Sequence, residues 1–90
     1  MQISTQDIKT MLIEVFSLEQ KVEDINDDSA IIGEGLGLDS VDALEIIAQI
    51  NRRFGLKIKG QTVRPEHFKN IKNLTDFVNE SLNSTGVVKP

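Results

Sequence analysis

The residues best suited to chemistry lie between positions 35 and 45, in the stretch Gly-Leu-Gly-Leu-Asp-Ser-Val-Asp-Ala-Leu-Glu. Asp39 is a good helix N-cap, so Ser40 is expected in the first turn of a helix with its hydroxyl exposed. At that position free backbone N–H groups and the helix dipole favour an attached phosphate. The pattern therefore predicts a serine prepared to hold a phosphodiester.

That serine depends on a helix predicted from Asp39 to about Phe54 and ended by Gly55, because glycine is typical of the position after a helix C-cap. The polar face of this helix comprises Asp42, Glu45, Gln49, Arg52 and Arg53. The other positions form an apolar arc of roughly 220°, comprising Val41, Ala43, Leu44, Ile46, Ile47, Ala48, Ile50 and Phe54. A helix this apolar is expected to pack against neighbours on several sides and to be central to the fold.

The other predicted elements are a helix over about residues 4–16, a short helix over about 65–70 and a last helix over about 73–82, with Ser4 and Asn73 as caps of the first and last. Residues 18–38 form a long loop whose apolar anchors are Val22, Ile25, Ile31, Ile32, Leu36 and Leu38. The sequence thus predicts an all-α, four-helix bundle of three longer helices and one short helix with a long first loop. We assign residues 1–84 to a single domain and residues 85–90 to a flexible C-terminal tail.

Composition limits the functions open to this chain of 90 residues. Four Phe with no Trp or Tyr, and a net charge of −4, disfavour a nucleic-acid partner, which calls for stacking faces and a basic surface. The absence of Cys excludes a disulfide framework and a Cys-based metal site. No apolar run approaches the ~20 residues that span a bilayer, and the first residues lack a signal-peptide pattern. We therefore expect a cytoplasmic protein with no membrane partner.

Charge is distributed unevenly along the chain. Residues 1–50 hold two lysines against eleven acids, whereas residues 51–90 hold eight basic residues against three acids. An acidic first half favours a partner with a basic docking surface, since complementary potentials speed encounter. Solubility alone is the alternative explanation, and charge asymmetry does not separate the two.

The stretch around Asp39 and Ser40 resembles the modification motif of acyl carrier proteins, and the order of helices, loop and short helix matches that family over nearly the whole chain. The resemblance implies that a Mg²⁺-dependent phosphopantetheinyl transferase attaches 4′-phosphopantetheine from coenzyme A to Ser40. The terminal thiol of this arm then bears acyl or malonyl-type groups as thioesters. The chain would be a monomeric carrier without catalytic residues, not an enzyme. It would serve acyltransferases, ketosynthases or acyl ligases of fatty-acid, lipid or polyketide-type synthesis.

The resemblance also assigns roles to further residues. It implies that Asp39 adjoins the attachment site and that partner enzymes with basic patches dock on Asp39, Val41, Asp42 and Glu45. The plainer explanation is that acids in the first turns only balance the helix dipole. It further implies that an acyl chain is sheltered by Ile47, Ile50, Ile58, Ile71 and Phe77. For any one of these residues, ordinary core packing is the simpler interpretation.

Several features depart from the family pattern. Arg52 and Arg53 end a central helix that is typically acidic, and residues 59–64 lengthen the connection to the short helix. The second half is made basic by Lys57, Lys59, Arg64, Lys69 and Lys72. These residues motivate the hypothesis of a specialised, free-standing carrier for a dedicated pathway rather than for the housekeeping fatty-acid synthase.

Alternative sites find less support in the sequence. Asp24, Asn26 and Asp28 begin like an EF-hand loop, but Ser29 and Gly35 stand where glycine and glutamate are required. The alternating glycines at 33, 35 and 37 lack dinucleotide-binding spacing and follow no predicted strand. A serine hydrolase would need a base for Ser40, and His67, the one histidine, lies on the predicted short helix without a nucleophile-elbow motif.

The closest rivals are other carriers. Peptidyl and aryl carriers usually show Gly-Gly-x-Ser before the helix, whereas this chain has Gly-Leu-Asp-Ser. A D-alanyl carrier is poorly separated by sequence. A plain interaction module that docks through the acidic helix also remains open, and it predicts that Ser40 is never modified.

Overall fold

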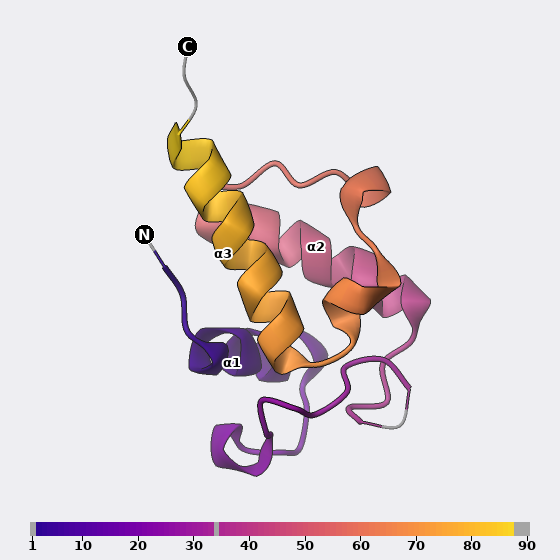
Figure 1. Ribbon diagram of the computed structural model, residues 1–90. Coiled ribbons are helices and arrows are strands. Elements are labelled where there is room, and N and C mark those ends of the chain that lie inside the picture. Colours follow the sequence, from indigo (N-terminus) through magenta and orange to yellow (C-terminus); the bar gives the residue numbers. More distant parts are fainter. Residues whose placement is uncertain (1, 34, 88–90) are drawn as a thin grey trace.

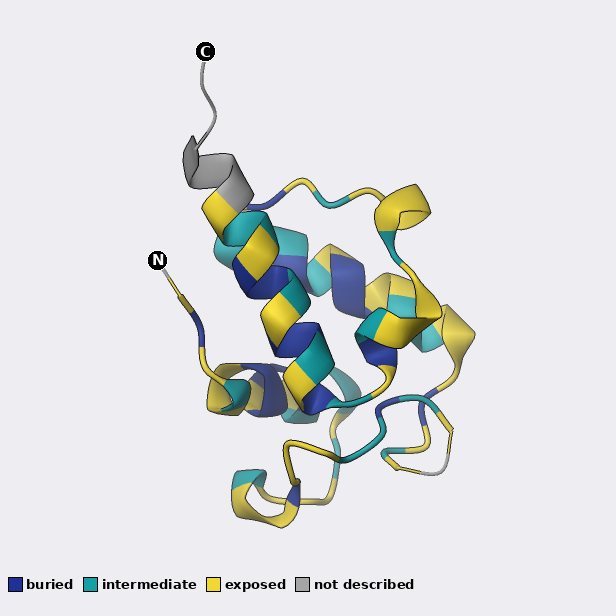
Figure 2. Cartoon of the chain, viewed as in Figure 1, coloured by how far each residue is buried: buried dark blue, intermediate teal, exposed yellow. Residues whose placement is uncertain are grey.

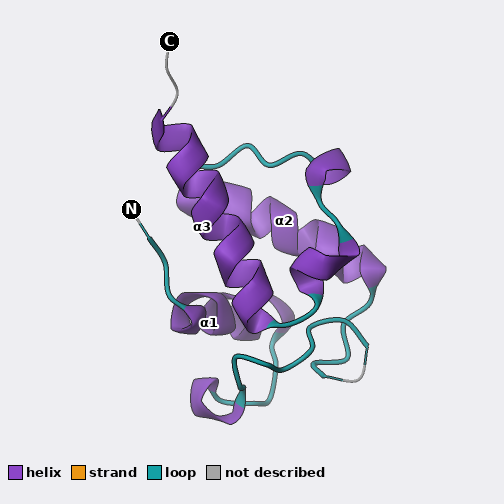
Figure 3. Ribbon diagram, viewed as in Figure 1, coloured by secondary structure: helices purple, strands orange, loops and turns teal. Residues whose placement is uncertain are grey.

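The computed structural model describes the backbone of residues 2–33 and 35–87 and the side chains of residues 2–33 and 35–83. Within these ranges the chain forms three α-helices, α1 (Thr5–Phe16), α2 (Ser40–Phe54) and α3 (Ile71–Val87), as Figures 1 and 3 show. Single turns of 3₁₀ helix, η1 (Val22–Asp24), η2 (Gly60–Thr62) and η3 (Pro65–Phe68), punctuate the connections. The described part of the chain has no strand beyond one isolated bridge, so the predicted all-α class is confirmed. None of its helices is long and apolar enough to cross a membrane.

Helix α1 begins where its capping residues predict. The Ser4 hydroxyl accepts a hydrogen bond from the Asp7 backbone N–H at 3.3 Å, and the Asp7 carboxylate accepts from the Ser4 N–H at 2.9 Å. This reciprocal box satisfies two donors that a helix start leaves without intrahelical partners. Ile3 and Ile8 on either side of it are buried, as a hydrophobic staple requires. The helix ends at Ser17, whose positive φ of 51° turns the chain away.

Helix α2 ends at Gly55 in the left-handed conformation, with φ of 67°, as the sequence predicts. The two arginines in its last turn complement the negative end of the helix dipole. Arg53 also donates to the Glu14 carboxylate of α1 at 2.9 Å, which ties the end of α2 to α1. One of the two basic departures from the family pattern therefore has a structural role.

The hydrophobic core lies where the three helices meet, and Figure 2 shows the buried stripes of the helices turned toward one another. Helix α2 contributes Ile46, Ile47 and Ile50 to this core. The sequence predicts that this helix packs against neighbours on several sides, but Leu44 and Ala48 of its apolar arc are exposed. Val41 is exposed as well, and the family resemblance assigns it to a docking role. The spacing of three and four residues aligns these three side chains as one apolar strip on the solvent side.

The short helix and the last helix differ in extent from the prediction. The expected helix over 65–70 is the single 3₁₀ turn η3, and α3 begins at Ile71 rather than near Asn73. Asn70 is the residue that caps α3, because its side-chain oxygen accepts the Asn73 N–H at 2.8 Å. Two backbone donors at the start of α3 are also satisfied by carbonyl groups of the distant first loop, since Ile71 donates to Ser29 at 3.2 Å and Lys72 donates to Asp27 at 3.0 Å.

Helix α3 continues to Val87, past the predicted end near Leu82. The backbone of residues 85–87, assigned above to a flexible tail, is therefore helical. Residues 88–90 of that tail lie outside the described residues. The domain boundary at residue 84 stays a prediction.

Candidate functional site

Ser40 is the first residue of α2 and is exposed to solvent. The preceding residue fixes its position, because the Asp39 carboxylate accepts hydrogen bonds from the backbone N–H groups of Val41 and Asp42, both at 3.1 Å. The Asp42 carboxylate in turn accepts from the Asp39 N–H at 3.0 Å. These three bonds make a reciprocal capping box around the serine, so Ser40 is held at the predicted helix start.

The capping box changes one expectation about the attached phosphate. The sequence predicts free backbone N–H groups in the first turn, but the Asp39 carboxylate takes those of Val41 and Asp42. A phosphate on Ser40 would therefore be stabilised by the helix dipole and by solvent, and not by hydrogen bonds from these two N–H groups.

A tight loop fixes the chain just before the serine. Gly33 donates to the Leu38 carbonyl at 2.8 Å, and Leu36 donates to the Ala30 carbonyl at 2.9 Å, which closes a ring of backbone bonds. Gly37 has a positive φ of 76°, and a methyl group on Gly35 would collide with the Ala30 carbonyl. The alternating glycines are therefore turn residues, as predicted, and they let the loop close directly beside the start of α2.

The four predicted docking residues lie on the first two turns of α2 or at its cap. Asp39, Val41 and Glu45 are exposed, and Val41 keeps 71% of its surface. Asp42 is half-buried and committed to the capping box. Sequence reasoning missed Leu44, which is 66% exposed and continues the surface from Val41. The spacing of three residues between these two places them on one face of the helix, but a high apolar content by itself predicts burial.

A cavity of about 330 Å³ opens beside Ser40. Its walls are largely apolar and are formed by Ile32, Ala43, Leu44, Ile47, Val63 and Phe68. Gly60, Arg64 and Pro65 from the segment around η2 and η3 complete the lining together with Ser40. A volume of this size has room for roughly ten groups the size of a water molecule. An alkyl group attached through Ser40 could therefore lie against this apolar wall.

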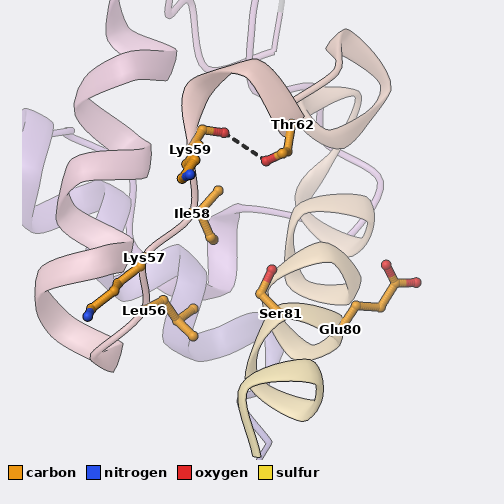
Figure 4. A pocket seen from close by; sticks show the side chains of 7 residues that line it. All are labelled: Leu56, Lys57, Ile58, Lys59, Thr62, Glu80 and Ser81. Atoms are coloured by element: carbon orange, nitrogen blue, oxygen red, sulfur yellow. Dashed lines mark hydrogen bonds between the residues drawn. The ribbon is translucent and has the colours of Figure 1, made fainter. Parts of the chain in front are cut away.

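The structure separates the five residues predicted to shelter an acyl chain. Ile47 lines the cavity beside Ser40, whereas Ile50 and Ile71 are fully buried in the core. Ile58 lines a different cavity of about 380 Å³, where Figure 4 shows Leu56 and Ile58 on the segment after α2, across from Ser81 on α3. Phe77 borders a third cavity, of about 300 Å³. The walls missed by sequence reasoning come mainly from the connection between α2 and α3, which carries no periodic pattern.

His67 is engaged elsewhere and does not serve Ser40. Its Nδ1 accepts the Arg64 backbone N–H at 3.0 Å, and its ring stacks on Phe77 with centroids 3.8 Å apart and planes 12° apart. Among the described residues, no histidine or carboxylate lines the cavity beside Ser40. In residues 2–33 and 35–83 no cluster of three potential metal ligands occurs either. The site thus offers an exposed hydroxyl and an apolar cavity without a nucleophile–base pair.

These features are those of a small helical carrier domain: an exposed serine at a helix start, exposed apolar and acidic side chains beside it and an apolar cavity next to it. The model of a protein family described as a phosphopantetheine attachment site matches residues 6–78. The chain therefore belongs to this family, as an acyl carrier protein, and the family's cofactor is a covalent 4′-phosphopantetheine.

Two curated proteins illustrate the similarity. An acyl carrier protein of Phytoplasma mali (strain AT) is 27% identical over 79 residues, which cover 88% of each chain. An acyl carrier protein of Phytoplasma australiense is 28% identical over 75 residues, which cover 83% of this chain and 92% of the relative.

Proposed function

We propose that this chain carries acyl groups as thioesters on a 4′-phosphopantetheine arm attached to the Ser40 hydroxyl and delivers them to partner enzymes of fatty-acid, lipid or polyketide-type synthesis. The observation that carries this proposal is the position of Ser40, exposed at the first residue of α2 and bordering an apolar cavity. When attached, the arm supplies the thiol on which acyl groups are held. The chain itself performs no bond-making step and acts as a carrier rather than as an enzyme.

The residues around Ser40 position it for modification by a phosphopantetheinyl transferase. Asp39 holds the first turn of α2 in place through its bonds to Val41 and Asp42. The serine is consequently presented in one orientation on a preformed helix end. Such presentation lowers the ordering cost when a partner binds, because little of the docking surface needs to be immobilised.

Partner enzymes would dock on the solvent side of α2. Val41 and Leu44 form an exposed apolar strip, and Asp39 and Glu45 place negative charge beside it. The complementary surface is an apolar patch rimmed by basic residues, since the apolar contact supplies affinity and the charges steer the encounter. The transferase, acyltransferases, ketosynthases and acyl ligases named above would share this surface in turn.

The acyl group would find shelter in the cavity beside Ser40. Ile47 and Phe68 form part of its apolar wall, which would remove alkyl groups from water. Each buried methylene group contributes about 0.8 kcal/mol, so a few of them suffice to favour the sheltered position. Binding of a partner enzyme would have to move the acyl group out of the cavity before its thioester reacts.

The proposal is tested by the intact mass of the purified protein before and after incubation with coenzyme A, Mg²⁺ and a broad-specificity phosphopantetheinyl transferase. We expect a gain of one phosphopantetheine that is absent in Ser40→Ala. Ser17→Gly is the matched control, because it removes another exposed hydroxyl at a positive φ that glycine tolerates. A folded protein that gains no mass would overturn the proposal and leave α2 as the surface of a plain interaction module.

A further inference from the structure

Among the residues that the structure describes, Arg64 alone brings a charged side chain to the lining of the cavity beside Ser40. The other lining residues are Ser40 itself, two residues without polar side chains at Gly60 and Pro65, and an apolar wall that includes Val63 and Phe68. A cation at the edge of an apolar cavity distinguishes ligands by charge, because opposite charge is attracted and like charge is repelled. Arg64 is exposed, so the effect has the modest size of a solvent-accessible ion pair.

The backbone holds Arg64 at this edge. Its N–H donates to His67 Nδ1 at 3.0 Å, and the His67 ring is stacked on Phe77 of α3. Pro65, the next residue, restricts the backbone further and also borders the cavity. The α-carbon of Arg64 is thus fixed relative to α3, while the exposed side chain stays free to reach a ligand.

No described residue forms an ion pair with Arg64. The ion pairs among the described residues engage Lys9, Arg53 and Lys72, and none involves Arg64. The acids nearest in sequence to the attachment site, Asp39 and Asp42, do not line the cavity, and both carboxylates accept the hydrogen bonds of the capping box. Of the side chains described, a ligand within the cavity therefore meets one positive charge without an ion-pair partner.

We infer that Arg64 makes this cavity selective for acyl groups that end in a carboxylate, the half-thioesters of dicarboxylic acids. The inference rests on the proposed attachment at Ser40. The alkyl part of such a group lies along the apolar wall, and its terminal carboxylate meets the guanidinium at the edge, a geometry that allows two parallel hydrogen bonds. An aminoacyl group brings an ammonium to the same place and is repelled, which separates this carrier from D-alanyl and peptidyl carriers.

The same guanidinium could instead contact the phosphodiester of the arm, which is also an anion. The phosphodiester and the acyl carboxylate differ in when they are present. A contact to the phosphodiester exists in the protein with an empty arm, whereas a contact to the acyl carboxylate appears only after loading. The experiment is designed around this difference.

The test uses the full chain, loaded at Ser40 by a phosphopantetheinyl transferase with three amide-linked coenzyme A analogues. Their five-carbon acyl groups end in a carboxylate, a primary amide or an ammonium, so length is matched and charge varies. Intact mass establishes loading, and backbone amide chemical shifts of Ile47, Val63 and Phe68 report occupancy of the cavity. Arg64→Gln removes the charge and Arg64→Lys retains it. Lys69→Gln is the control, since Lys69 is exposed on the same segment and does not line the cavity.

We expect the carboxylate analogue to occupy the cavity about two- to fivefold more than the amide analogue, the range of a solvent-accessible ion pair. The ammonium analogue should occupy it less than the amide. Arg64→Gln should abolish this order, and Lys69→Gln should preserve it. Arg64→Lys should keep the order with a smaller difference, because an ammonium lacks the planar fork.

Equal occupancy by the three analogues, or an order that survives Arg64→Gln, would overturn the inference. So would an equal effect of Arg64→Gln on the ³¹P shift of the empty and the loaded arm, which would assign Arg64 to the phosphodiester. A chain that gains no mass from any analogue refutes the attachment itself, and that outcome is distinct because loading is measured first.

Discussion

Asn79 of α3 forms two hydrogen bonds with the backbone of Ile3, a residue 76 positions away in the sequence. Its side-chain oxygen accepts the Ile3 N–H at 2.8 Å, and its side-chain nitrogen donates to the Ile3 carbonyl at 3.1 Å. Asn79 is buried, so this pair joins the start of the chain to the last helix inside the core. The amide completes the pairing of a backbone segment that belongs to neither a helix nor a sheet.

We expect Asn79→Ala to lower the free energy of unfolding by about 1–3 kcal/mol, because it leaves two buried backbone groups without partners. Urea denaturation followed by circular dichroism measures the loss. Asn83→Ala is the matched control, since Asn83 lies one turn along the same helix and is exposed. Equal stability of the two variants would contradict the structural role of the Asn79 side chain.

The glycine loop before Ser40 gives a second prediction. Gly35→Ala should destabilise the protein more than Gly55→Ala does, because a methyl group at position 35 meets the Ala30 carbonyl whereas position 55 is open. Gly55→Ala should destabilise the protein by only about 1 kcal/mol, because alanine is strained at the positive φ of this position. Denaturation midpoints rank the two variants. The rate of phosphopantetheine transfer should also fall more for Gly35→Ala, since the loop supports the helix start, and the reverse ranking would contradict the described loop.

The ion pair between Lys9 and Asp27 gives a prediction on pH. A hydrogen bond from Lys9, and next to it one from Thr5, holds the pKa of the Asp27 carboxyl below its ordinary value of 3.8. A lowered pKa in the folded state stabilises the fold above pH 3.8, and this contribution is lost as the pH falls through the folded-state pKa. Asp27→Asn should therefore lower the melting temperature at pH 7, and the difference from the unmodified chain should shrink below pH 3.8.

The control for this pH dependence is Asp28→Asn. Asp28 is exposed and has no ion pair among the residues that the structure describes. The melting temperature of Asp28→Asn should match that of the unmodified chain both at pH 7 and below pH 3.8. A difference for Asp27→Asn that stays constant from pH 7 to pH 3 would mean that the Lys9 contact does not titrate as described.

The exposed apolar strip on α2 predicts that a substitution in it weakens partner docking but leaves the stability of the protein nearly unchanged. Leu44→Ser should leave the denaturation midpoint nearly unchanged, because Leu44 is 66% exposed. It should slow phosphopantetheine transfer about five- to tenfold, because the loss of an anchor residue of an interface costs about 1–1.4 kcal/mol. Gln20→Ser, an exposed site outside the helices, is the control. Transfer kinetics at limiting carrier concentration measure the effect, and an unchanged rate would remove Leu44 from the docking surface.

The basic end of α2 tests the hypothesis of a dedicated pathway. We expect a generic fatty-acid ketosynthase and malonyl transferase to use this chain less efficiently than their own carrier, because Arg52 stands where an acid is typical. Arg52→Glu should improve that use, whereas Arg53→Glu should lower stability by removing the bond to Glu14. Steady-state rates with each carrier make the comparison. Equal efficiency of the unmodified chain and the generic carrier would end the hypothesis.

The sequence predicts the elements that depend on local signals. Ser4, Asp39 and Gly55 cap or end helices as their chemistry requires, and each lies where the sequence places it. The position of Ser40 follows directly, because it depends only on the adjacent cap. Local patterns of this kind are sufficient for the helices and for the candidate attachment residue.

The remainder depends on contacts between distant segments. Helix α3 starts earlier than predicted because carbonyl groups of the first loop accept its N–H groups, a contact with no local signal. The exposure of Leu44 depends on which neighbours cover α2, and apolar content alone suggests burial. The cavity beside Ser40 includes Arg64 and Phe68 from a connection without periodicity, so its composition emerges only in three dimensions.

The glycine loop and the capping box hold Ser40, the proposed attachment residue, from both sides, because Leu38 before it is buried and the Asp39 carboxylate binds the first turn of the helix after it. The backbone at Ser40 therefore contributes almost no movement to a group attached there. Successive reaction centres must be reached by the swing of the arm, or by release of the whole domain from one enzyme and its capture by the next. The reach of a single docking event is consequently set by the length of the arm, and enzymes farther apart than that length must compete for the same domain.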